Sequence, residues 1–290
     1  MNTQQAFSDL NQKLRTIYDD AEAKNIANWV MESITGKRRQ EWVLSDIGAL
    51  DEQQLVKLET YALELLEYRP VQYVLGESYF YNLKLFVDEN VLIPRPETEE
   101  LVHWAINSIA DPKQNRKIID IGTGSGCIAL ALKMELPSAN ILAMDVSAQA
   151  LAVAQKNATL LNLDIEFEEM DILDGERHEG LPSFDIIISN PPYITLPEKE
   201  RILPNVLQYE PHQALFVTDE DPLQFYKAIE HFAAKKLKSN GSVFLELHKD
   251  FAVATELYYK EKGWFTELRK DMQDNDRMLR CSKINFSQKP

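Results

Sequence analysis

The sequence predicts an α/β protein in which a helical N-terminal domain precedes an open, mostly parallel sheet covered by helices on both faces. Three observations support this class. Apolar residues recur at helical spacing between Ala6 and about Leu66, short β-branched runs alternate with helical segments from Lys117 onward, and a glycine-rich turn follows the first of these runs. A chain of 290 residues is long enough for two cores of ordinary size.

Residues 1–70 are interpreted as a helical substrate-recognition domain. Their apolar positions are spaced three or four residues apart, and no proline interrupts the chain before Pro70. Ser45 or Asp51 is placed to cap the last helix of this region. A small helical domain more often binds or positions a partner than carries out chemistry, so we expect recognition here.

Residues 71–95 are interpreted as a connector. Residues 79–87 are rich in aromatic and apolar side chains and predict a β-hairpin that turns near Asn82. This composition favours a structured connector over a flexible Gly/Ser linker. Pro96 then suits the first position of a helix that runs to about Ile109, with acidic residues in its first turn.

Residues 96–290 are interpreted as the catalytic domain, built on a seven-stranded sheet. A short Asp/Asn-rich loop between the last two strands predicts an antiparallel strand at the end of the sheet. The expected strands cover residues 117–121, 140–145, 165–170, 184–189, 242–247, 264–270 and 277–282. The expected helices between them cover residues 125–135, 147–161, 222–237 and 251–260.

The net charge of −15 argues against nucleic acid as a partner, because phosphates repel a polyanion whose cations are not gathered on one face. The tightest cationic cluster, residues 37–39, is better explained as a solvated helix end. No apolar run has the length of a membrane span. Cys127 and Cys281 lack the spacing of a disulfide framework or a zinc site. We expect a cytoplasmic monomer without a bound metal that acts on a protein partner rather than on nucleic acid or a membrane.

The glycine-rich turn is Asp120-Ile121-Gly122-Thr123-Gly124-Ser125-Gly126, at the first strand-to-helix junction of the sheet. Its G-x-G-x-G spacing differs from the dinucleotide fingerprint G-x-G-x-x-G. The carboxylate of Asp120 repels a pyrophosphate and attracts an amino group. S-adenosylmethionine has a cationic amino-acid tail and no phosphate, so this turn predicts S-adenosylmethionine as the cofactor, bound by Asp120, Gly122, Thr123, Gly124, Ser125 and Gly126.

Two further acids follow the next strands. Asp145 ends the second strand, where it can accept hydrogen bonds from both ribose hydroxyls, and Asp171 follows the third strand, where it can accept from the adenine amino group. Each has a simpler interpretation: Asp145 as a cap of the helix that begins at Ser147, and Asp171 as an ordinary turn residue.

Asn190-Pro191-Pro192-Tyr193 follows the buried strand 184–189. The two prolines fix the backbone and present carbonyl acceptors without competing N–H donors. Asn190 adds a side-chain carbonyl and Tyr193 a flat ring. These groups suit a planar NH2 group, although the tetrapeptide alone is also compatible with a simple turn after a strand.

Together these residues resemble a class I S-adenosylmethionine-dependent methyltransferase with an Asn-Pro-Pro-Tyr motif, which implies a Rossmann-like sheet. That motif is shared by enzymes that methylate adenine amines, guanine N2 or protein glutamine. Further motifs make the chain similar, over nearly its whole length, to the HemK/PrmC family of peptide chain release factor N5-glutamine methyltransferases. They are Arg69-Pro70 with Tyr73 and Gly76, Phe80, residues 92–99, Tyr209-Glu210-Pro211 with Ala214-Leu215, and Asp271 with Asp276-Arg277.

The resemblance implies methylation of the glutamine side chain in the Gly-Gly-Gln motif of class 1 release factors. It implies that Asn190 and the Pro191 carbonyl accept the two amide N–H bonds, and that Tyr193 covers one face of the amide. Pro192 and Phe80 are expected to line the glutamine pocket. Asn190 is also expected to contact the cofactor, and Ile172 stands where some relatives carry an aromatic residue beside the adenine.

Several motif residues keep two interpretations. Arg95 and Glu97 either bind the methionine end of the cofactor or brace the hairpin against the catalytic domain. Glu210 with Pro211 either closes a loop over the site or forms a structural turn. The chain also departs from the family at His248, where relatives often have glycine after the fifth strand.

Two other functions compete with this one. An adenine-N6 or guanine-N2 nucleic-acid methyltransferase would use the same tetrapeptide on a base, but it needs a cationic face that this chain lacks at the level of sequence. A non-catalytic S-adenosylmethionine-binding protein has no need of the clamp at residues 190–193.

Overall fold

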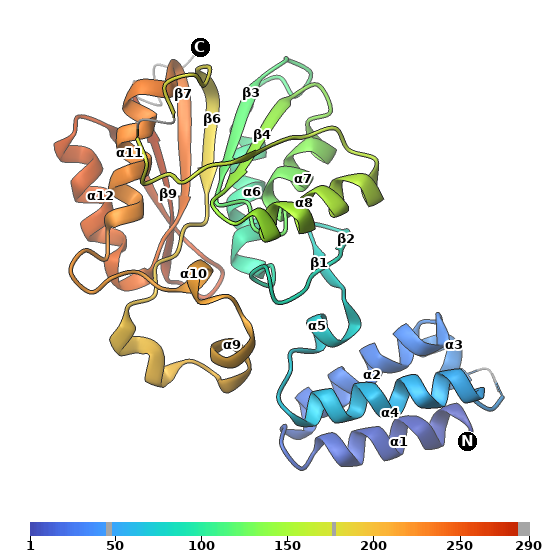
Figure 1. Cartoon of the computed structure of the whole chain (residues 1–290). Helices are drawn as coiled ribbons and strands as arrows, with labels where there is room; N and C mark the ends of the chain where they lie inside the picture. Colours follow the sequence, from blue (N-terminus) through green and yellow to red (C-terminus); the bar gives the residue numbers. More distant parts are fainter. Residues whose placement is uncertain (45–47, 176–177, 284–290) are drawn as a thin grey trace. The chain divides into compact units, whose positions relative to one another are not determined.

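The computed structural model describes residues 1–44, 48–175 and 178–283 (Figure 1). It divides into a helical unit, Met1–Glu77 with Leu203–Tyr209, and a sheet unit, Ser78–Ile202 with the chain from Glu210 onward. The predicted boundaries were residues 70 and 95. The structure instead groups the chain up to Glu77 with the helices and places the hairpin with the sheet.

The helical unit has one apolar core, to which four of its helices contribute residues. Asp51 caps α4 through a capping box with Gln54, which satisfies backbone N–H groups at the start of that helix. Ser45, the other predicted cap, lies outside the described residues. The helices are α1 (Thr3–Leu14), α2 (Asp20–Thr35), α3 (Arg39–Leu44), α4 (Glu52–Leu66), α5 (Val71–Leu75) and α9 (Pro204–Tyr209).

The predicted hairpin forms from β1 (Ser78–Phe80) and β2 (Leu83–Leu85), which pair antiparallel. Its two turn residues, Tyr81 and Asn82, have φ angles of 48° and 63°, as a tight two-residue hairpin turn requires. The Tyr81 N–H donates to Glu99 Oε1 at 3.0 Å. The hairpin is thus fixed to the helix that follows it.

In the described part of the chain, a seven-stranded sheet has the order β5-β4-β3-β6-β7-β9-β8. The five strands from β5 to β7 in this order are parallel to one another, and β9 pairs antiparallel with both β7 and β8. The predicted antiparallel strand is therefore present, but it inserts between β7 and β8 instead of lying at the edge. The strands are β3 (Lys117–Ile121), β4 (Asn140–Asp145), β5 (Glu166–Glu169), β6 (Phe184–Ser189), β7 (Leu237–Glu246), β8 (Phe265–Lys270) and β9 (Asp276–Ser282).

Helices cover both faces of this sheet (Figure 1). Because successive strand residues point to opposite faces, Ile118 and Ile186 join one apolar cluster whereas Ile119 and Ile187 join another. The first cluster includes residues of α6 (Pro96–Asn107), α7 (Cys127–Glu135) and α8 (Ala148–Leu161), and the second includes residues of α11 (Gln224–Lys236) and α12 (Ala252–Glu261). Alternate residues of one strand therefore build two separate cores.

Some element bounds differ from the prediction for identifiable reasons. Helix α7 begins at Cys127 rather than Ser125, because Gly126 has a φ of 81° and cannot belong to a right-handed helix. Strand β7 begins directly after α11, at Leu237. The chain between residues 195 and 220 contains η1 (Leu196–Arg201), α9 and α10 (His212–Leu215). A further short helix, η2 (Lys249–Phe251), precedes α12.

Among the residues that the structure describes, no helix combines the length and the apolar character needed to cross a bilayer.

Candidate active site

A cavity lies at the carboxyl ends of β3, β4 and β6, the edge where an open α/β sheet places its ligand. Its wall combines residues from four turns that are distant in sequence. Of the residues predicted from sequence, it is lined by Gly122, Gly124, Asp145, Asp171, Ile172, Asn190, Pro191 and Pro192. The fold thus brings the predicted cofactor residues and the predicted amide clamp to one place.

The glycine-rich turn closes over the end of β4. The N–H groups of Gly122 and Thr123 both donate to Met144 O, at 2.8 and 2.9 Å, and the Gly124 N–H donates to Asp145 Oδ2 at 2.9 Å. Gly122 and Gly124 have positive φ angles, of 73° and 53°, which side chains rarely adopt. At Gly126 a Cβ would also lie 3.1 Å from Ala154 Cβ, so the turn approaches α8 as closely as a glycine permits.

Asp145 and the cap of α8 are separate features. Ser147 caps the helix by accepting from the Ala150 N–H, whereas Asp145 Oδ1 accepts from the Ser147 N–H at 3.0 Å. Burial raises the pKa of Asp145, and the N–H groups of Ser147 and Gly124 oppose that rise. Each carboxylate oxygen can accept more than one hydrogen bond, so Asp145 retains acceptor capacity toward the cavity that it lines.

Asp120 lies beneath the glycine-rich turn and is not among the residues that line the cavity. It is fully buried, and its Oδ2 accepts from the Thr123 hydroxyl at 2.6 Å. Burial raises the pKa of Asp120 to about 7. Within the described residues, Asp120 Oδ1 and Ser125 Oγ are buried without a hydrogen-bond partner. A buried acceptor beside the turn fits a ligand with a cationic polar end.

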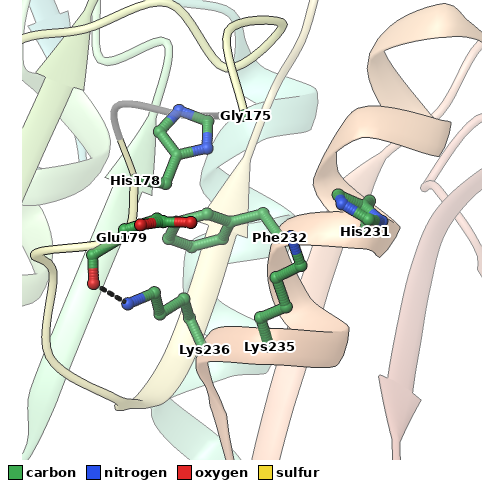
Figure 2. A pocket seen from close by; sticks show the side chains of 7 residues that line it. All are labelled: Gly175, His178, Glu179, His231, Phe232, Lys235 and Lys236. Carbon is green, nitrogen blue, oxygen red and sulfur yellow. Dashed lines mark hydrogen bonds between the residues drawn. The ribbon is translucent and has the colours of Figure 1, made fainter.

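Asp171 lies in the turn after β5 and lines the cavity. Contacts with Leu173 and His178 hold it in place. Asp171 Oδ1 accepts from the Leu173 N–H at 2.9 Å, and the Asp171 carbonyl lies 2.9 Å from His178 Nε2. The buried ring of His178 packs edge-on against Phe232 of α11, as Figure 2 shows for the neighbouring hollow. Lys236 in the same hollow donates to the carbonyls of Glu179 and Leu181. The contacts of His178 and Lys236 therefore fix the turn that contains Asp171 to α11.

The tetrapeptide at residues 190–193 is held by a buried acid. The Asn190 side-chain nitrogen donates to Thr98 Oγ1 at 3.1 Å, and the Tyr193 hydroxyl donates to Glu246 Oε1 at 3.1 Å. Thr98 in turn donates to Glu246 Oε2 at 2.6 Å. The nitrogen of the Asn190 amide faces Thr98, so the carbonyl oxygen of the same amide is directed away from Thr98, and Asn190 is one of the residues that line the cavity.

Two predicted substrate-binding residues, Tyr193 and Phe80, are not among the residues that line the cavity. Tyr193 directly follows the lining residues Asn190, Pro191 and Pro192, whereas Phe80 lies in the hairpin. Phe80 is 1% exposed and belongs to the core beneath the hairpin. The alternation of the hairpin turns Phe80 inward, where it joins Leu83 and Leu85 in one apolar cluster. Phe80 therefore stabilises the attachment of the hairpin instead of contacting a ligand in this cavity.

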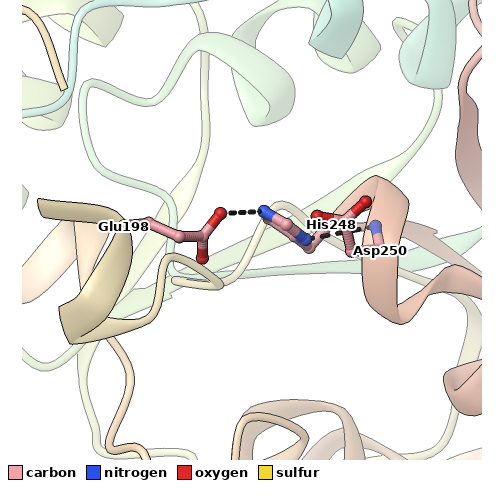
Figure 3. Close-up of side chains that lie close together, drawn as sticks. All are labelled: Glu198, His248 and Asp250. Carbon is pink, nitrogen blue, oxygen red and sulfur yellow. Dashed lines mark hydrogen bonds and ion pairs between the residues drawn. The ribbon is translucent and has the colours of Figure 1, made fainter. Parts of the chain in front are cut away.

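Glu198, His248 and Asp250 form a cluster after the tetrapeptide, drawn in Figure 3, with candidate ligand atoms within 4.8 Å of one another. Hydrogen bonds within the protein account for this proximity. His248 Nε2 lies 2.9 Å from Glu198 Oε1, and the Asp250 N–H donates to His248 Nδ1 at 3.2 Å. The His248 ring also lies beside Tyr193, with ring centroids 5.6 Å apart. His248, a departure from the family pattern, thus ties η1 to the end of β7.

Arg95 and Glu210 form an ion pair at 2.6 Å, in which the Glu210 side chain is 1% exposed. Glu210 Oε2 also accepts from the Ile93 N–H at 3.3 Å. Glu97 instead contacts Gln273 Nε2, at 3.3 Å. The Arg95 contact therefore braces the chain before α6 against the chain that leads to Pro211, which lines the cavity.

Part of the cavity wall comes from residues that belong to none of the predicted motifs. Asn90, Val91 and Leu92 line it from the chain that follows the hairpin, and Phe225 lines it from α11. These residues form no motif that chemistry would single out. The one available signal is position, because residues 90–92 directly precede the Ile93-Pro94-Arg95 run.

Comparison with known proteins locates this architecture in a family. Residues 5–76 match the family described as PrmC N-terminal domain, and residues 105–214 match the family described as Methyltransferase small domain. A release factor glutamine methyltransferase of Flavobacterium psychrophilum is 47% identical, over 95% of this chain and 96% of that protein. This chain belongs to the release factor glutamine methyltransferase family.

Other release factor glutamine methyltransferases agree with this assignment. The enzyme of Bacteroides thetaiotaomicron is 35% identical over 94% of this chain and 98% of its own length. A methyltransferase of Pyrococcus furiosus, solved as a crystal structure, shares the fold with a TM-score of 0.51 at 15% identity, covering 80% of this chain and 99% of its own. The predicted fold class, that of class I methyltransferases, is confirmed.

Membership of the release factor glutamine methyltransferase family makes S-adenosylmethionine the cofactor. The cavity fits it on its own chemistry. Apolar side chains of Met144, Val146 and Ile172 can cover the adenine, and Asp145 beside the glycine-rich turn can accept from the ribose. The predicted cofactor residues Gly122, Gly124, Asp145, Asp171, Ile172 and Asn190 line this cavity, whereas Asp120, Thr123, Ser125 and Gly126 are not among its lining residues.

Proposed function

We propose that this enzyme methylates the side-chain amide nitrogen, N5, of the glutamine in the Gly-Gly-Gln motif of class 1 peptide chain release factors. One observation carries the proposal. Asn190, Pro191 and Pro192 line the same cavity as Asp145 and the glycine-rich turn, which supports a role for them beside the cofactor. Family membership supports the same substrate, since the relatives carry the name release factor glutamine methyltransferase.

The clamp addresses the weak nucleophilicity of an amide, whose nitrogen lone pair is delocalised into the carbonyl. S-adenosylmethionine supplies the methyl group on a sulfonium. The Asn190 side-chain oxygen and the Pro191 carbonyl accept the two amide N–H bonds of the glutamine and turn its lone pair toward that methyl group. Orientation and the fixed carbonyl dipoles can together lower the barrier by several kcal/mol.

The residues around the clamp complete it. Pro191 and Pro192 have no N–H groups that could compete for the acceptors. Tyr193 covers one face of the amide, held by its hydroxyl contact with Glu246. Both ring nitrogens of His248, beside Tyr193, already have hydrogen-bond partners: Nε2 contacts Glu198, and Nδ1 accepts from the Asp250 N–H. We propose that the proton of the methylated nitrogen leaves to solvent.

Recognition of the folded substrate is assigned to the helical residues 1–70. Residues 5–70 of this range lie within the region that matches the PrmC N-terminal domain. We propose that the enzyme acts as a monomer on a protein partner. Its net charge of −15 disfavours the alternative of a nucleic-acid methyltransferase, because phosphates repel an acidic surface.

Transfer of labelled methyl groups distinguishes these functions. With S-adenosylmethionine labelled on its methyl group, the purified enzyme is expected to label a class 1 release factor and to leave duplex DNA and ribosomal RNA unlabelled. The matched control is a release factor whose Gly-Gly-Gln glutamine is replaced by alanine. Equal labelling of protein and nucleic acid, or of both release factors, would contradict the proposal.

A further inference from the structure

A buried chain of hydrogen bonds reaches the clamp from behind. Glu246 is 1% exposed and ends β7, Thr98 is 3% exposed and lies in the first turn of α6, and Asn190 follows β6. Thr98 Oγ1 lies 2.6 Å from Glu246 Oε2 and 3.1 Å from Asn190 Nδ2. Three elements that are distant in sequence thus meet in one line of polar atoms.

The donor and acceptor groups of Glu246, Thr98 and Asn190 fix the direction of each hydrogen bond in this series. The Thr98 hydroxyl donates its single hydrogen to Glu246 Oε2. The Thr98 oxygen can then only accept from Asn190, and the group of Asn190 that donates is its NH2. The carbonyl oxygen of the same planar amide is consequently directed away from Thr98. If Thr98 were free to donate, Asn190 could turn over and present NH2 where the substrate also presents NH2.

The second carboxylate oxygen of Glu246 also acts as a hydrogen-bond acceptor. Glu246 Oε1 accepts from the Tyr193 hydroxyl at 3.1 Å. Burial raises the pKa of Glu246, but the hydroxyls of Thr98 and Tyr193 and the charge of Arg277 oppose that rise. Burial also raises the pKa of Tyr193 well above its usual value, which keeps its hydroxyl a donor. Arg277 is itself fixed, with Nη1 donating to Leu247 O at 3.0 Å.

We propose that Glu246, acting through Thr98, is a positioning residue that fixes the Asn190 amide with its oxygen toward the substrate nitrogen. The proposal rests on the proposed role of Asn190 as a clamp. It assigns a function to two residues that are not among those lining the cavity. It also explains why an acid is buried in the core at the end of β7, where its burial is otherwise costly.

The test uses the full-length enzyme with substitutions at each link. Thr98→Val keeps the shape of the side chain but removes the hydroxyl, and Glu246→Met removes the acceptor with little change in length. Each is expected to lower kcat about tenfold to a hundredfold, less than the outright loss of an oriented group, while the Kd for S-adenosylmethionine stays within about twofold. Thr98→Ser keeps the hydroxyl and is expected to keep most of kcat.

A matched control separates positioning from stability. Glu230 is also a buried acid, 7% exposed, and accepts from Trp264 Nε1 at 2.9 Å. Glu230→Met is expected to lower the melting temperature and to leave kcat unchanged at a temperature where every variant is folded. Because Thr98 and Glu246 act through one amide, the double variant Thr98→Val with Glu246→Met is expected to be no slower than the slower single variant.

Several outcomes would overturn the proposal. They are full kcat in Thr98→Val, loss of kcat in Thr98→Ser equal to that in Thr98→Val, an equal loss in Glu230→Met, or multiplied losses in the double variant. Asn190→Ala distinguishes failure of this inference from failure of the proposed function. If Asn190→Ala is inactive while Thr98→Val is fully active, the clamp stands and the positioning chain is wrong. If Asn190→Ala is active, the clamp itself is wrong.

Discussion

Replacing Asn190 with alanine is expected to lower kcat about a hundredfold to a thousandfold, while the affinity for S-adenosylmethionine changes little. The substitution removes the side-chain oxygen that accepts one amide N–H of the substrate glutamine, so the nitrogen lone pair is no longer directed at the methyl group. The Pro191 carbonyl remains. Single-turnover labelling of a release factor measures the chemical step, and equilibrium titration with S-adenosylmethionine measures cofactor affinity.

The control for this variant is Asn140→Ala. Asn140 is exposed at the start of β4, at the edge of the sheet opposite the cavity, and its replacement is expected to leave both quantities unchanged. A second pattern of effects would mean that Asn190 binds the cofactor and does not orient the substrate amide. In that case Asn190→Ala would weaken S-adenosylmethionine binding and would retain the rate of the chemical step at saturating cofactor.

Replacing Asp145 with alanine is expected to weaken S-adenosylmethionine binding about a hundredfold, the effect of losing about 2–3 kcal/mol. Two losses combine. The ribose hydroxyls lose their charged acceptor, and the N–H groups of Gly124 and Ser147 lose the carboxylate that holds the glycine-rich turn against β4. Equilibrium titration of the folded variant with S-adenosylmethionine, after its melting temperature is recorded, checks the prediction.

Asp185→Ala is the matched control. Asp185 also accepts from a backbone N–H, that of Lys117 at 2.8 Å, and pairs with Lys238, but it lies near the start of β6, away from the cavity. It is expected to lose stability and to keep cofactor affinity. If Asp185→Ala weakens cofactor binding as much as Asp145→Ala does, the Asp145 effect is a general loss of stability and the ribose assignment fails.

The fold was predictable where short-range patterns dictate it. The alternation of β-branched runs with helical segments predicted every strand of the sheet, and Pro96 and Asp51 marked helix starts correctly because caps act locally. The position of β9 between β7 and β8 was not predictable, since strand order depends on long-range pairing. The helices α9 and α10 were missed because they are too short for a periodic pattern to be visible.

The site was predictable to the extent that its chemistry is concentrated in motifs. The glycine-rich turn and residues 190–193 can be recognised from their local residue types. The fold places members of both at one cavity. The contacts of Thr98 with Glu246 were not predictable, because the two residues are 148 positions apart. Thr98 reads as part of an ordinary helix start. Phe80 was predicted to line the substrate pocket because an aromatic side chain suits such a site, but it is a buried core residue.

The most direct test of the account is to locate the transferred methyl group. After reaction with S-adenosylmethionine, the release factor is digested and its Gly-Gly-Gln peptide is fragmented in a mass spectrometer. The account predicts one added methyl group on the glutamine side chain, formed by the wild-type enzyme and lost with Asn190→Ala. A methyl group on another residue, or an unmodified glutamine in a release factor that carries label, would contradict the assignment of the cavity at residues 190–193 as a clamp for one amide nitrogen.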